Sequence, residues 1–355
     1  MNASIFVAIL MVTLLSINNP ITNLFAQDQQ EQHQQQDDNN KKCQNTGDYL
    51  TSFNCGTVDD QTNIRHFTLV TEENIPVAIS DEPEIRFPSW SFNGSVPGPT
   101  MRMTEGDNVS ITVVNSPGNN LSHSLHLHSI HSGAQDGVLG PSGAIKPGES
   151  FTYTFIADPA GVYPYHCHVE PIENHLNRGL YGMMIIDPKE DREPVDHEMV
   201  MLMNGYDLNL AAEKEPTFAI PTSEQANMMI AGSEDVELGQ ERDNEIYTVN
   251  GRAFTYMKDP IELKTDDTVR VYLVNMLEFD LVNSLHLHGS MFNYIPSGTE
   301  ESAPTFTDIV TLSQGDRGIM EFEFPFPGQY MFHAHQTEFS SLGWMGTFNA
   351  TDTET

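Results

Sequence analysis

The chain has 355 residues, which is long enough for two domains of ordinary size. It carries 16 Lys and Arg residues against 50 Asp and Glu residues, a formal net charge of −34. Such a charge repels polyanions and favours cationic substrates or basic partners, so we do not expect nucleic-acid binding. Adaptation to a salty or acidic medium explains the same charge equally well.

The first 26 residues contain no charged side chain and include a mostly apolar run over residues 5–15. This pattern predicts a secretory signal over residues 1–26, although the usual basic start is missing. The run is short for a membrane span, and an uncleaved anchor stays open as the alternative to cleavage. We therefore expect a secreted or extracytoplasmic protein, in the periplasm or at the cell surface.

A polar lead-in over residues 27–56 follows the signal. Residues 27–42 are rich in Gln, Asp and Asn and almost lack apolar side chains. This composition predicts a disordered, low-complexity segment, with ordered structure beginning near Thr57. Cys43 and Cys55 lie close together in the sequence, and outside the cell such a pair favours a disulfide over two unpaired thiols.

From residue 57 onwards the chain shows short β-rich runs separated by Gly, Pro and Asn, without a long amphipathic helical pattern. In the first half these runs are residues 67–70, 110–114, 151–155 and 183–187. Many short strands with turn residues between them predict an all-β fold of sandwiches or barrels.

Four motifs occur twice in the same order, which predicts two copies of one β-domain. The copies match at residues 105–115 and 265–275, 124–128 and 284–288, 161–168 and 328–335, and 179–182 and 343–346. We expect domain 1 over residues 57–187, a charged linker with proline over residues 188–195, and domain 2 over residues 196–350.

Domain 2 has two stretches that need an interpretation of their own. Its first strand alternates Met199, Met201 and Met203, which indicates a buried core face; a methionine relay for copper(I) is the alternative. Residues 206–244 have no counterpart in domain 1. Either a lid or subunit-contact arm or a passive surface loop explains this acidic stretch.

Eight of the fourteen histidines form four His-x-His pairs in the repeated motifs. Alternation along a strand places both imidazoles of such a pair on one face. The pairs are His126 with His128, His166 with His168, His286 with His288, and His333 with His335. Eight imidazoles are enough to hold three copper ions if the two histidine-bearing faces meet.

Cys167 lies between His166 and His168, so it points to the opposite face of the same segment. With His123 and His175 it makes the two-histidine, one-cysteine ligand set of a blue-copper site. The matching positions of domain 2 hold Asn283, Ala334 and Phe339. Only domain 1 is therefore expected to bind a blue copper.

These motifs resemble the two-domain multicopper oxidases, laccase-like relatives of copper nitrite reductases. The resemblance covers residues 60–350 and includes the connector Asn93-Gly-x-x-Pro-Gly-Pro-Thr. It implies two tandem cupredoxin-like Greek-key barrels or sandwiches and a homotrimer, with each trinuclear copper site between domain 1 of one subunit and domain 2 of the next.

The resemblance also assigns the copper ligands, about four copper ions per subunit. It implies a type 1 copper at His123, Cys167 and His175, a type 2 copper at His126 and His286, and a type 3 pair at His128, His166, His168, His288, His333 and His335.

Two further residues are candidates for roles at these sites. The resemblance places Leu180 in the axial position of the type 1 copper, with Met183 or Met184 as the alternative; a missing axial donor raises the reduction potential. Asp136 is a candidate proton donor beside the trinuclear site, and its other interpretation is a turn residue in the dipeptide Asp136-Gly137.

The predicted function is oxidation of a one-electron donor near the ring edge of His175, coupled to reduction of O2 to water. A phenol, a metal ion, a hydroxylamine-like nitrogen compound and a small redox protein are all open as donors. A copper nitrite reductase is the alternative, although its catalytic copper needs only three histidines. A non-catalytic blue-copper electron carrier, which needs no trinuclear site, is the second alternative.

Overall fold

The computed structural model describes residues 43–81, 84–190, 192–215, 217–219 and 244–352. Nearly half of the chain is in strands, so the predicted all-β class is confirmed. The expected signal over residues 1–26 and the polar residues 27–42 lie outside the described residues. Among those that are described, no helix is long and apolar enough to cross a membrane.

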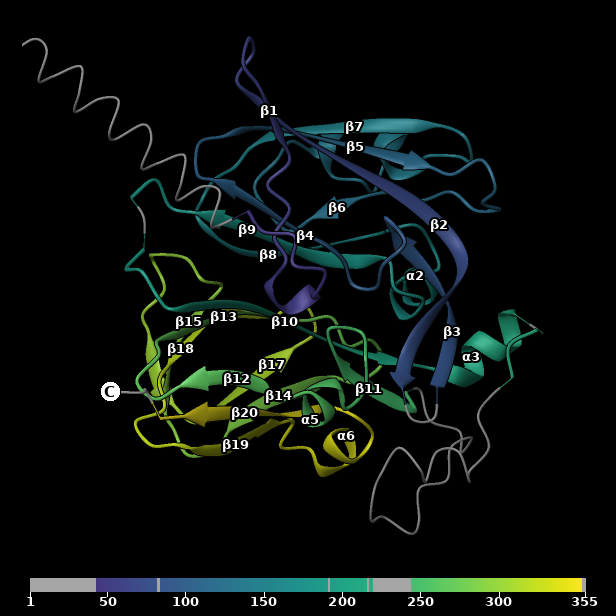
Figure 1. The fold of residues 1–355 in the computed structure, drawn as a ribbon. Helices are drawn as coiled ribbons and strands as arrows, with labels where there is room; N and C mark the ends of the chain where they lie inside the picture. Colours follow the sequence, from purple (N-terminus) through teal and green to yellow (C-terminus); the bar gives the residue numbers. More distant parts are fainter. Residues whose placement is uncertain (1–42, 82–83, 191, 216, 220–243, 353–355) are drawn as a thin grey trace, which may run out of the picture. The chain divides into compact units, whose positions relative to one another are not determined.

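The first half of the chain forms two sheets (Figure 1). Its strands are β1 (Thr57–Asp59), β2 (Ile64–Asp81), β3 (Glu84–Phe92), β4 (Gly98–Thr104), β5 (Asn108–Asn115), β6 (His126–Leu127), β7 (Ser150–Ile156), β8 (Gly161–His166) and β9 (Tyr181–Asp187). One sheet has the order β1-β2-β5-β7, with β3 paired to β2, and the other has the order β4-β9-β8-β6.

The second half repeats this two-sheet arrangement. Its strands are β10 (His197–Tyr206), β11 (Ile246–Val249), β12 (Ile261–Lys264), β13 (Val269–Asn275), β14 (Val282–Leu287), β15 (Phe292–Pro296), β16 (Thr305–Thr307), β17 (Ile309–Ser313), β18 (Arg317–Phe322), β19 (Gly328–His333) and β20 (Met345–Thr351). The sheet orders are β11-β10-β13-β18-β15-β16 and β12-β20-β19-β14-β17.

The helices are short and lie between strands. They are the 3₁₀ helices η1 (Tyr49–Thr51), η2 (Gly133–Gln135) and η3 (Gly140–Gly143), and the α-helices α2 (Ile172–Asn177), α3 (Leu208–Lys214), α5 (Thr255–Lys258) and α6 (Thr337–Ser341). Helices α2 and α6 each follow a His-x-His motif, at the same point of the two halves.

The same strand pairings recur in both halves. Strand β6 is antiparallel to β8 with His126 opposite His166, and β14 is antiparallel to β19 with His286 opposite His333. Parallel pairing joins β2 to β5 and β10 to β13. The repeated motifs of the sequence therefore occupy equivalent positions in two copies of one β-architecture.

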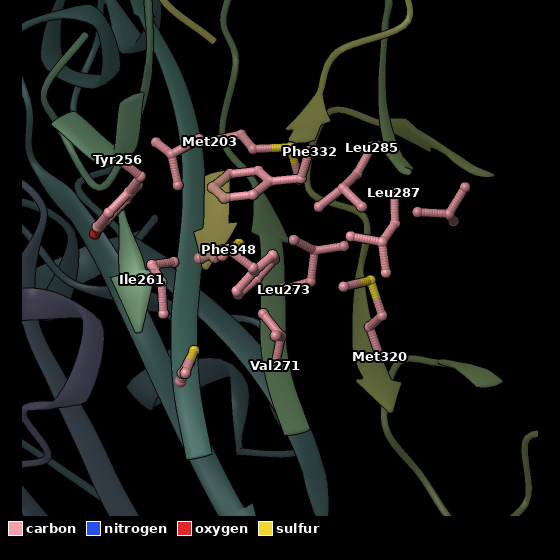
Figure 2. Packing of buried hydrophobic residues seen from close by; sticks show 14 of the residues in the cluster. Met203, Tyr256, Ile261, Val271, Leu273, Leu285, Leu287, Met320, Phe332 and Phe348 are labelled. Atoms are coloured by element: carbon pink, nitrogen blue, oxygen red, sulfur yellow. The ribbon is translucent and has the colours of Figure 1, made fainter. Parts of the chain in front are cut away.

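Strand β10 is buried on both faces. Met199, Met201 and Met203 point into the core of domain 2, as predicted for a buried face, and Figure 2 shows Met203 among the packed side chains. The alternating Val200 and Leu202 belong to another apolar cluster, which also contains side chains of β8 and β9 from domain 1. A strand covered on both sides needs apolar residues at every position, which explains the uninterrupted apolar run.

The prediction that ordered structure begins near Thr57 is wrong for residues 43–56. Leu50 of η1 packs in the core of domain 2, and Phe53 packs in the cluster between the domains. Asn54 is tied to β4 by a hydrogen bond from the Arg102 amide to its carbonyl oxygen, 2.8 Å. Buried Leu50 and Phe53 supply apolar burial that the polar residues before them lack.

Both Cys43 and Cys55 are disulfide-bonded, as predicted, and Cys167 is a free, buried cysteine. The stretch that has no counterpart in domain 1 begins with α3, whose amide at Leu210 donates to Asp207 Oδ1 at 2.7 Å. Phe218 then packs edge-on against Phe87 of β3, with ring centroids 5.7 Å apart. Residues 220–243 lie outside the described part, so the question of a lid or passive loop stays open.

A buried ion-pair network joins the two domains at Arg102. Its guanidinium donates to Asp187 at 2.7 Å and to Glu198 at 2.8 Å, and its side chain is only 3% exposed. Burial acts to raise the pKa of Glu198, but Arg102 and the other donors around the carboxylate outweigh it and lower that pKa to about 2. The Glu198 carboxylate is therefore charged at neutral pH, and both Asp187 and Glu198 pair with Arg102.

Replacing Arg102 by Met is expected to lower the free energy of unfolding by about 3–5 kcal/mol at pH 7, because buried Asp187 loses its charged partner and Glu198 loses one of its two arginines. Urea denaturation of the copper-free protein measures the change. Arg86→Met is the matched control, since Arg86 pairs with Glu84 and both side chains are 56% exposed. That control should lose less than about 1 kcal/mol, and equal losses in the two variants would contradict the expectation.

Candidate metal centres

Alternation at the end of β8 places adjacent residues on two sides of a sheet. The rings of His166 and His168 lie on one side and stack with centroids 5.7 Å apart. Cys167 lies on the other side, is completely buried and belongs to the core of domain 1. This is the arrangement that the tripeptide predicts.

The sulfur of Cys167 lies beside two imidazoles. Its Sγ is 3.2 Å from His175 Nδ1 and 3.8 Å from His123 Nδ1, and all three side chains are buried. The Ser124 amide donates to the same sulfur at 3.4 Å. These three residues bring one thiolate and two imidazole nitrogens together, which is the donor set of a blue-copper site.

The electrostatics of this group favour the thiolate. Burial raises the pKa of Cys167, but its hydrogen bonds with His123 and His175 outweigh burial and lower the pKa to about 5. Burial lowers the pKa of His123, whereas hydrogen bonds to Cys167 and Glu73 raise it to about 9. A preformed thiolate is the form of cysteine that binds a metal.

Leu180, rather than Met183 or Met184, lies next to Cys167. The carbonyl oxygen of Leu180 accepts the Cys167 amide at 2.9 Å; Leu180 and Met184 share an apolar cluster with Cys167, whereas Met183 belongs to another. Tyr181 is opposite His166 in the β8–β9 pairing, so Met183 and Met184 follow two and three residues further along β9. That displacement is roughly 7–10 Å at the rise of a strand.

His175 is only 1% exposed, so a donor that docks near it would not contact its ring directly, and electron entry through this ring stays a prediction. Trp90 packs edge-on against it, with ring centroids 4.9 Å apart, and also contacts His123 at 5.7 Å. Among the described residues, His175 Nε2 has no hydrogen-bond partner. Electrons from a donor must therefore cross a layer of protein to reach this ring.

Four imidazoles of domain 1 form a group that we call the domain 1 quartet: His126, His128, His166 and His168. The ring of His126 lies 5.1 Å from those of His128 and His168 and 5.2 Å from that of His166. His128 Nε2 and His166 Nε2 are 3.1 Å apart. Ring nitrogens that converge in this way resemble the first shell of a metal site.

Domain 2 repeats this geometry in the domain 2 quartet: His286, His288, His333 and His335. The ring of His286 lies 5.0 Å from that of His288 and 5.5 Å from those of His333 and His335. His288 Nε2 and His333 Nε2 are 3.0 Å apart. The two quartets thus have the same internal spacing.

Backbone carbonyl groups fix the tautomer of four of these rings. The Nδ1 atoms donate to main-chain oxygens at 2.7–2.9 Å: His126 to Asp136, His166 to Cys167, His286 to Asp308, and His333 to Ala334. The lone pair of each ring is therefore on Nε2, which faces the other histidines. Such an anchored, neutral imidazole is the usual protein ligand of copper.

Protonation does not compete strongly for these nitrogens at neutral pH. Burial and the neighbouring histidines lower the pKa of His128 to about 4, and burial lowers that of His166 to about 3. In domain 2 burial and the neighbouring rings also lower the pKa of His288 and His333. These four rings thus present neutral nitrogen donors, and the donor set of the quartets fits copper.

A carboxylate accompanies each quartet. Asp136 Oδ1 lies 3.3 Å from His126 Nδ1 and 3.8 Å from His131 Nε2, so the predicted candidate is at the domain 1 quartet. Asp308 Oδ2 lies 3.8 Å from His286 Nδ1 in domain 2. The sequence analysis missed Asp308, because the two loops that carry the carboxylates differ in length and no motif aligns them.

The two quartets form separate groups among the described residues. His288 and His335 are exposed, whereas His166 is buried. His286 and His288 border an open pocket of about 1020 Å³, which Met291 and Phe306 also line. Each quartet is therefore a separate group of imidazoles on its own domain.

Domain 2 has no counterpart of the sulfur site. Ala334 and Phe339 stand where domain 1 has Cys167 and His175. Phe339 stacks on Tyr247, with ring centroids 4.1 Å apart, and fills the position with apolar contact. Asn283, in the place of His123, donates to Asn275 Oδ1 at 3.4 Å.

A blue-copper ligand set and histidine quartets on a duplicated β-framework define a copper-dependent oxidoreductase. Models of the multicopper oxidase family match residues 76–191 and 225–354, more than half of the chain. The chain belongs to the multicopper oxidase family.

Individual relatives point to two activities. The chain is 38% identical to a multicopper oxidase of known structure, with a TM-score of 0.70, covering 85% of this chain and 95% of that one. It is 27% identical to a copper nitrite reductase from Nitrosomonas europaea, with a TM-score of 0.67, covering 81% of this chain and 94% of that one.

A relative from Neisseria meningitidis, a copper-containing nitrite reductase, is 28% identical over 271 residues. The match covers 75% of this chain and 64% of that one, so the chain spans less than two thirds of the length of this relative.

In the copper-free protein, Cys167 is expected to be a thiolate above a pH of about 5 and a thiol below it, because its pKa is lowered. A pH titration of the ultraviolet thiolate absorbance measures the midpoint. Cys43 and Cys55 are disulfide-bonded, so Cys167→Ser gives the background. A midpoint near the ordinary cysteine value of about 8.5 would contradict the expected stabilisation by His123 and His175.

Proposed function

We propose that this protein is a multicopper oxidase that couples oxidation of a one-electron donor at a type 1 copper to reduction of O2 to water at a trinuclear copper cluster. The observation that carries the proposal is the presence of four converging imidazoles in each domain. Eight imidazoles match the demand of three copper ions, whereas three satisfy a single tetrahedral site with one open position.

Copper would supply the redox chemistry at both kinds of site. The residues of the chain supply geometry: His123, Cys167 and His175 hold the type 1 ion, and the quartets hold the other three. Because Cys167 is bonded through the main chain to His166 and His168, only a few covalent bonds separate the two sites. The Asp136 carboxylate lies 3.3 Å from His126 Nδ1, where it would donate protons to the oxygen-reducing site.

A ring of subunits would complete the trinuclear sites. We propose a homotrimer in which the domain 1 quartet of one subunit meets the domain 2 quartet of the next. Exposed apolar side chains near both quartets support this arrangement: Ile130 (67%) and Leu139 (78%) in domain 1, and Phe306 (67%) and Met291 (41%) in domain 2. Such patches are typical of protein–protein contacts.

The alternative is a copper nitrite reductase, and it is favoured by two of the similar proteins described above, which are copper nitrite reductases. His168 and His335 are the residues that weigh against it, because each adds a fourth ring to its quartet. The −34 charge also disfavours recruitment of an anion such as nitrite and suits a cationic donor or a basic redox protein.

An extracytoplasmic location is part of the proposal. It is supported by the disulfide-bonded state of Cys43 and Cys55 and by the uncharged, apolar start of the chain. The donor itself stays undetermined among a phenol, a metal ion, a small nitrogen compound and a small redox protein.

Purified, copper-loaded protein is expected to contain about four copper ions per chain and to consume oxygen with a generic electron donor. About two copper ions per chain, with nitric oxide formed from nitrite, would instead identify the reductase. A blue protein with one copper ion and neither activity would identify an electron carrier. Metal analysis, oxygen uptake and nitrite turnover on one preparation distinguish these outcomes.

His168→Ala is expected to lower oxygen consumption at least 100-fold and to reduce the copper content, while the blue absorbance at Cys167 stays. His66→Ala is the matched control, because it removes the same kind of side chain from an exposed position on β2. Unchanged oxygen consumption in His168→Ala would contradict a role for the fourth ring of the domain 1 quartet.

A further inference from the structure

Glu73 is a buried carboxylate beside the sulfur site, and the motif analysis did not identify it. It lies in β2 where the pairing with β3 is irregular: the register shifts between Glu72 and Ile75, and Asn74 has a φ of 55°. Such a bulge re-aims side chains, and bulges are common next to active sites. Glu73 lies on the same inward face of β2 as the buried Phe67, Leu69 and Thr71, directly before Asn74.

Glu73 contacts the outer nitrogen of a predicted copper ligand. Its Oε1 accepts a hydrogen bond from His123 Nε2 at 3.1 Å, and the two side chains are 5% and 0% exposed. The same carboxylate accepts the Leu121 amide at 2.9 Å and the Asn120 amide at 3.0 Å. Three N–H donors on fixed groups leave the carboxylate little freedom to move.

This contact determines which nitrogen of His123 carries the proton. A carboxylate accepts, so Nε2 keeps its proton, and in the neutral ring that binds a metal the lone pair is on Nδ1, the atom that faces Cys167 Sγ at 3.8 Å. A carboxylate on the outer nitrogen makes the imidazole a stronger electron donor. A fixed negative charge in a buried site also favours the more highly charged ion, Cu(II) over Cu(I).

Domain 2 serves as an internal comparison. In the parallel pairings Thr71 is opposite Asn115 and Met203 is opposite Asn275, and these asparagines match in the repeat. Two residues further along, Glu73 of domain 1 therefore corresponds to Gly205 of domain 2. The carboxylate is absent from the domain that lacks the sulfur ligands, so the β-framework itself does not require it.

We propose that Glu73 is a positioning residue of the type 1 copper site, which fixes the tautomer of His123 and keeps the reduction potential below the value that the copper ligands alone would give. This inference rests on the part of the proposed function that places a blue copper at Cys167. It does not depend on oxygen reduction, so a blue protein that consumes no oxygen would overturn the oxidase assignment and leave Glu73 to be tested.

The test is a redox titration of the blue absorbance in copper-loaded wild type, Glu73→Gln and Glu72→Gln. Glu73→Gln removes the charge at nearly constant shape, and its equilibrium is expected to shift about tenfold or more toward Cu(I), which is about 59 mV for one electron. Glu72→Gln changes the net charge equally one residue earlier and should match the wild type. Equal potentials in all three proteins would overturn the proposal.

Glu73→Asp separates charge from turn structure. It keeps the carboxylate, so its equilibrium should lie closer to wild type than that of Glu73→Gln. If Glu73 only stabilised the turn at Asn120 and Leu121, its substitution would change the unfolding midpoint. The reduction potential of Glu73→Asp would then not lie between those of the wild type and Glu73→Gln. Potentials of Glu73→Asp and Glu73→Gln that shift by the same amount would therefore count against the proposed role.

A second measurement uses the wild-type protein alone, so it needs no folded variant. Nitrogen-15 spectra of the histidine rings in the diamagnetic Cu(I) form of the wild type report which nitrogen of His123 carries the proton. Protonation at Nε2 is expected, with Nδ1 bound to copper. A His123 ring with its proton on Nδ1, or with Nε2 bound to copper, would overturn the proposal whatever the behaviour of the variants.

Discussion

Both kinds of candidate metal site depend on the alternation of side chains where β8 ends. Within three residues the chain turns two imidazoles toward the domain 1 quartet and one sulfur toward the domain core. The pairing of His126 with His166 across β6 and β8 fixes where this alternation begins. A shift of one residue in that register would exchange the two faces, and sulfur and imidazoles would trade places.

Duplication explains why domain 2 retains one site and lacks the other. Its quartet has the same register, with His286 opposite His333, and the same contact between Nε2 atoms. The sulfur site is replaced as a whole, because a buried polar group that keeps only some of its partners is costlier than apolar packing. Phe339 on Tyr247 and the small Ala334 are the packed replacement.

Much of the site was predictable because strand geometry converts spacing into direction. The His-x-His pairs and Cys167 needed only alternation by two, and the repeat supplied the correspondence between domains. Glu73 was not predictable in this way, since its contact with His123 joins residues 50 positions apart and lies outside the repeated motifs. The burial of His175 and the docking of Leu50 depend on contacts between segments far apart in the sequence, which no local pattern encodes.

The quartets are organised before any metal binds. Main-chain oxygens hold the Nδ1 atoms of two rings in each quartet, so the direction of those Nε2 lone pairs is set by the sheets. Neutral rings at 3.0–3.1 Å between nitrogens are a poor arrangement for water and a good one for a cation. The exposure of His288 and His335 leaves one side of the domain 2 quartet uncovered. Preorganised donors and an open side together suit the domain 2 quartet to the proposed role, in which a second histidine-bearing surface completes the site.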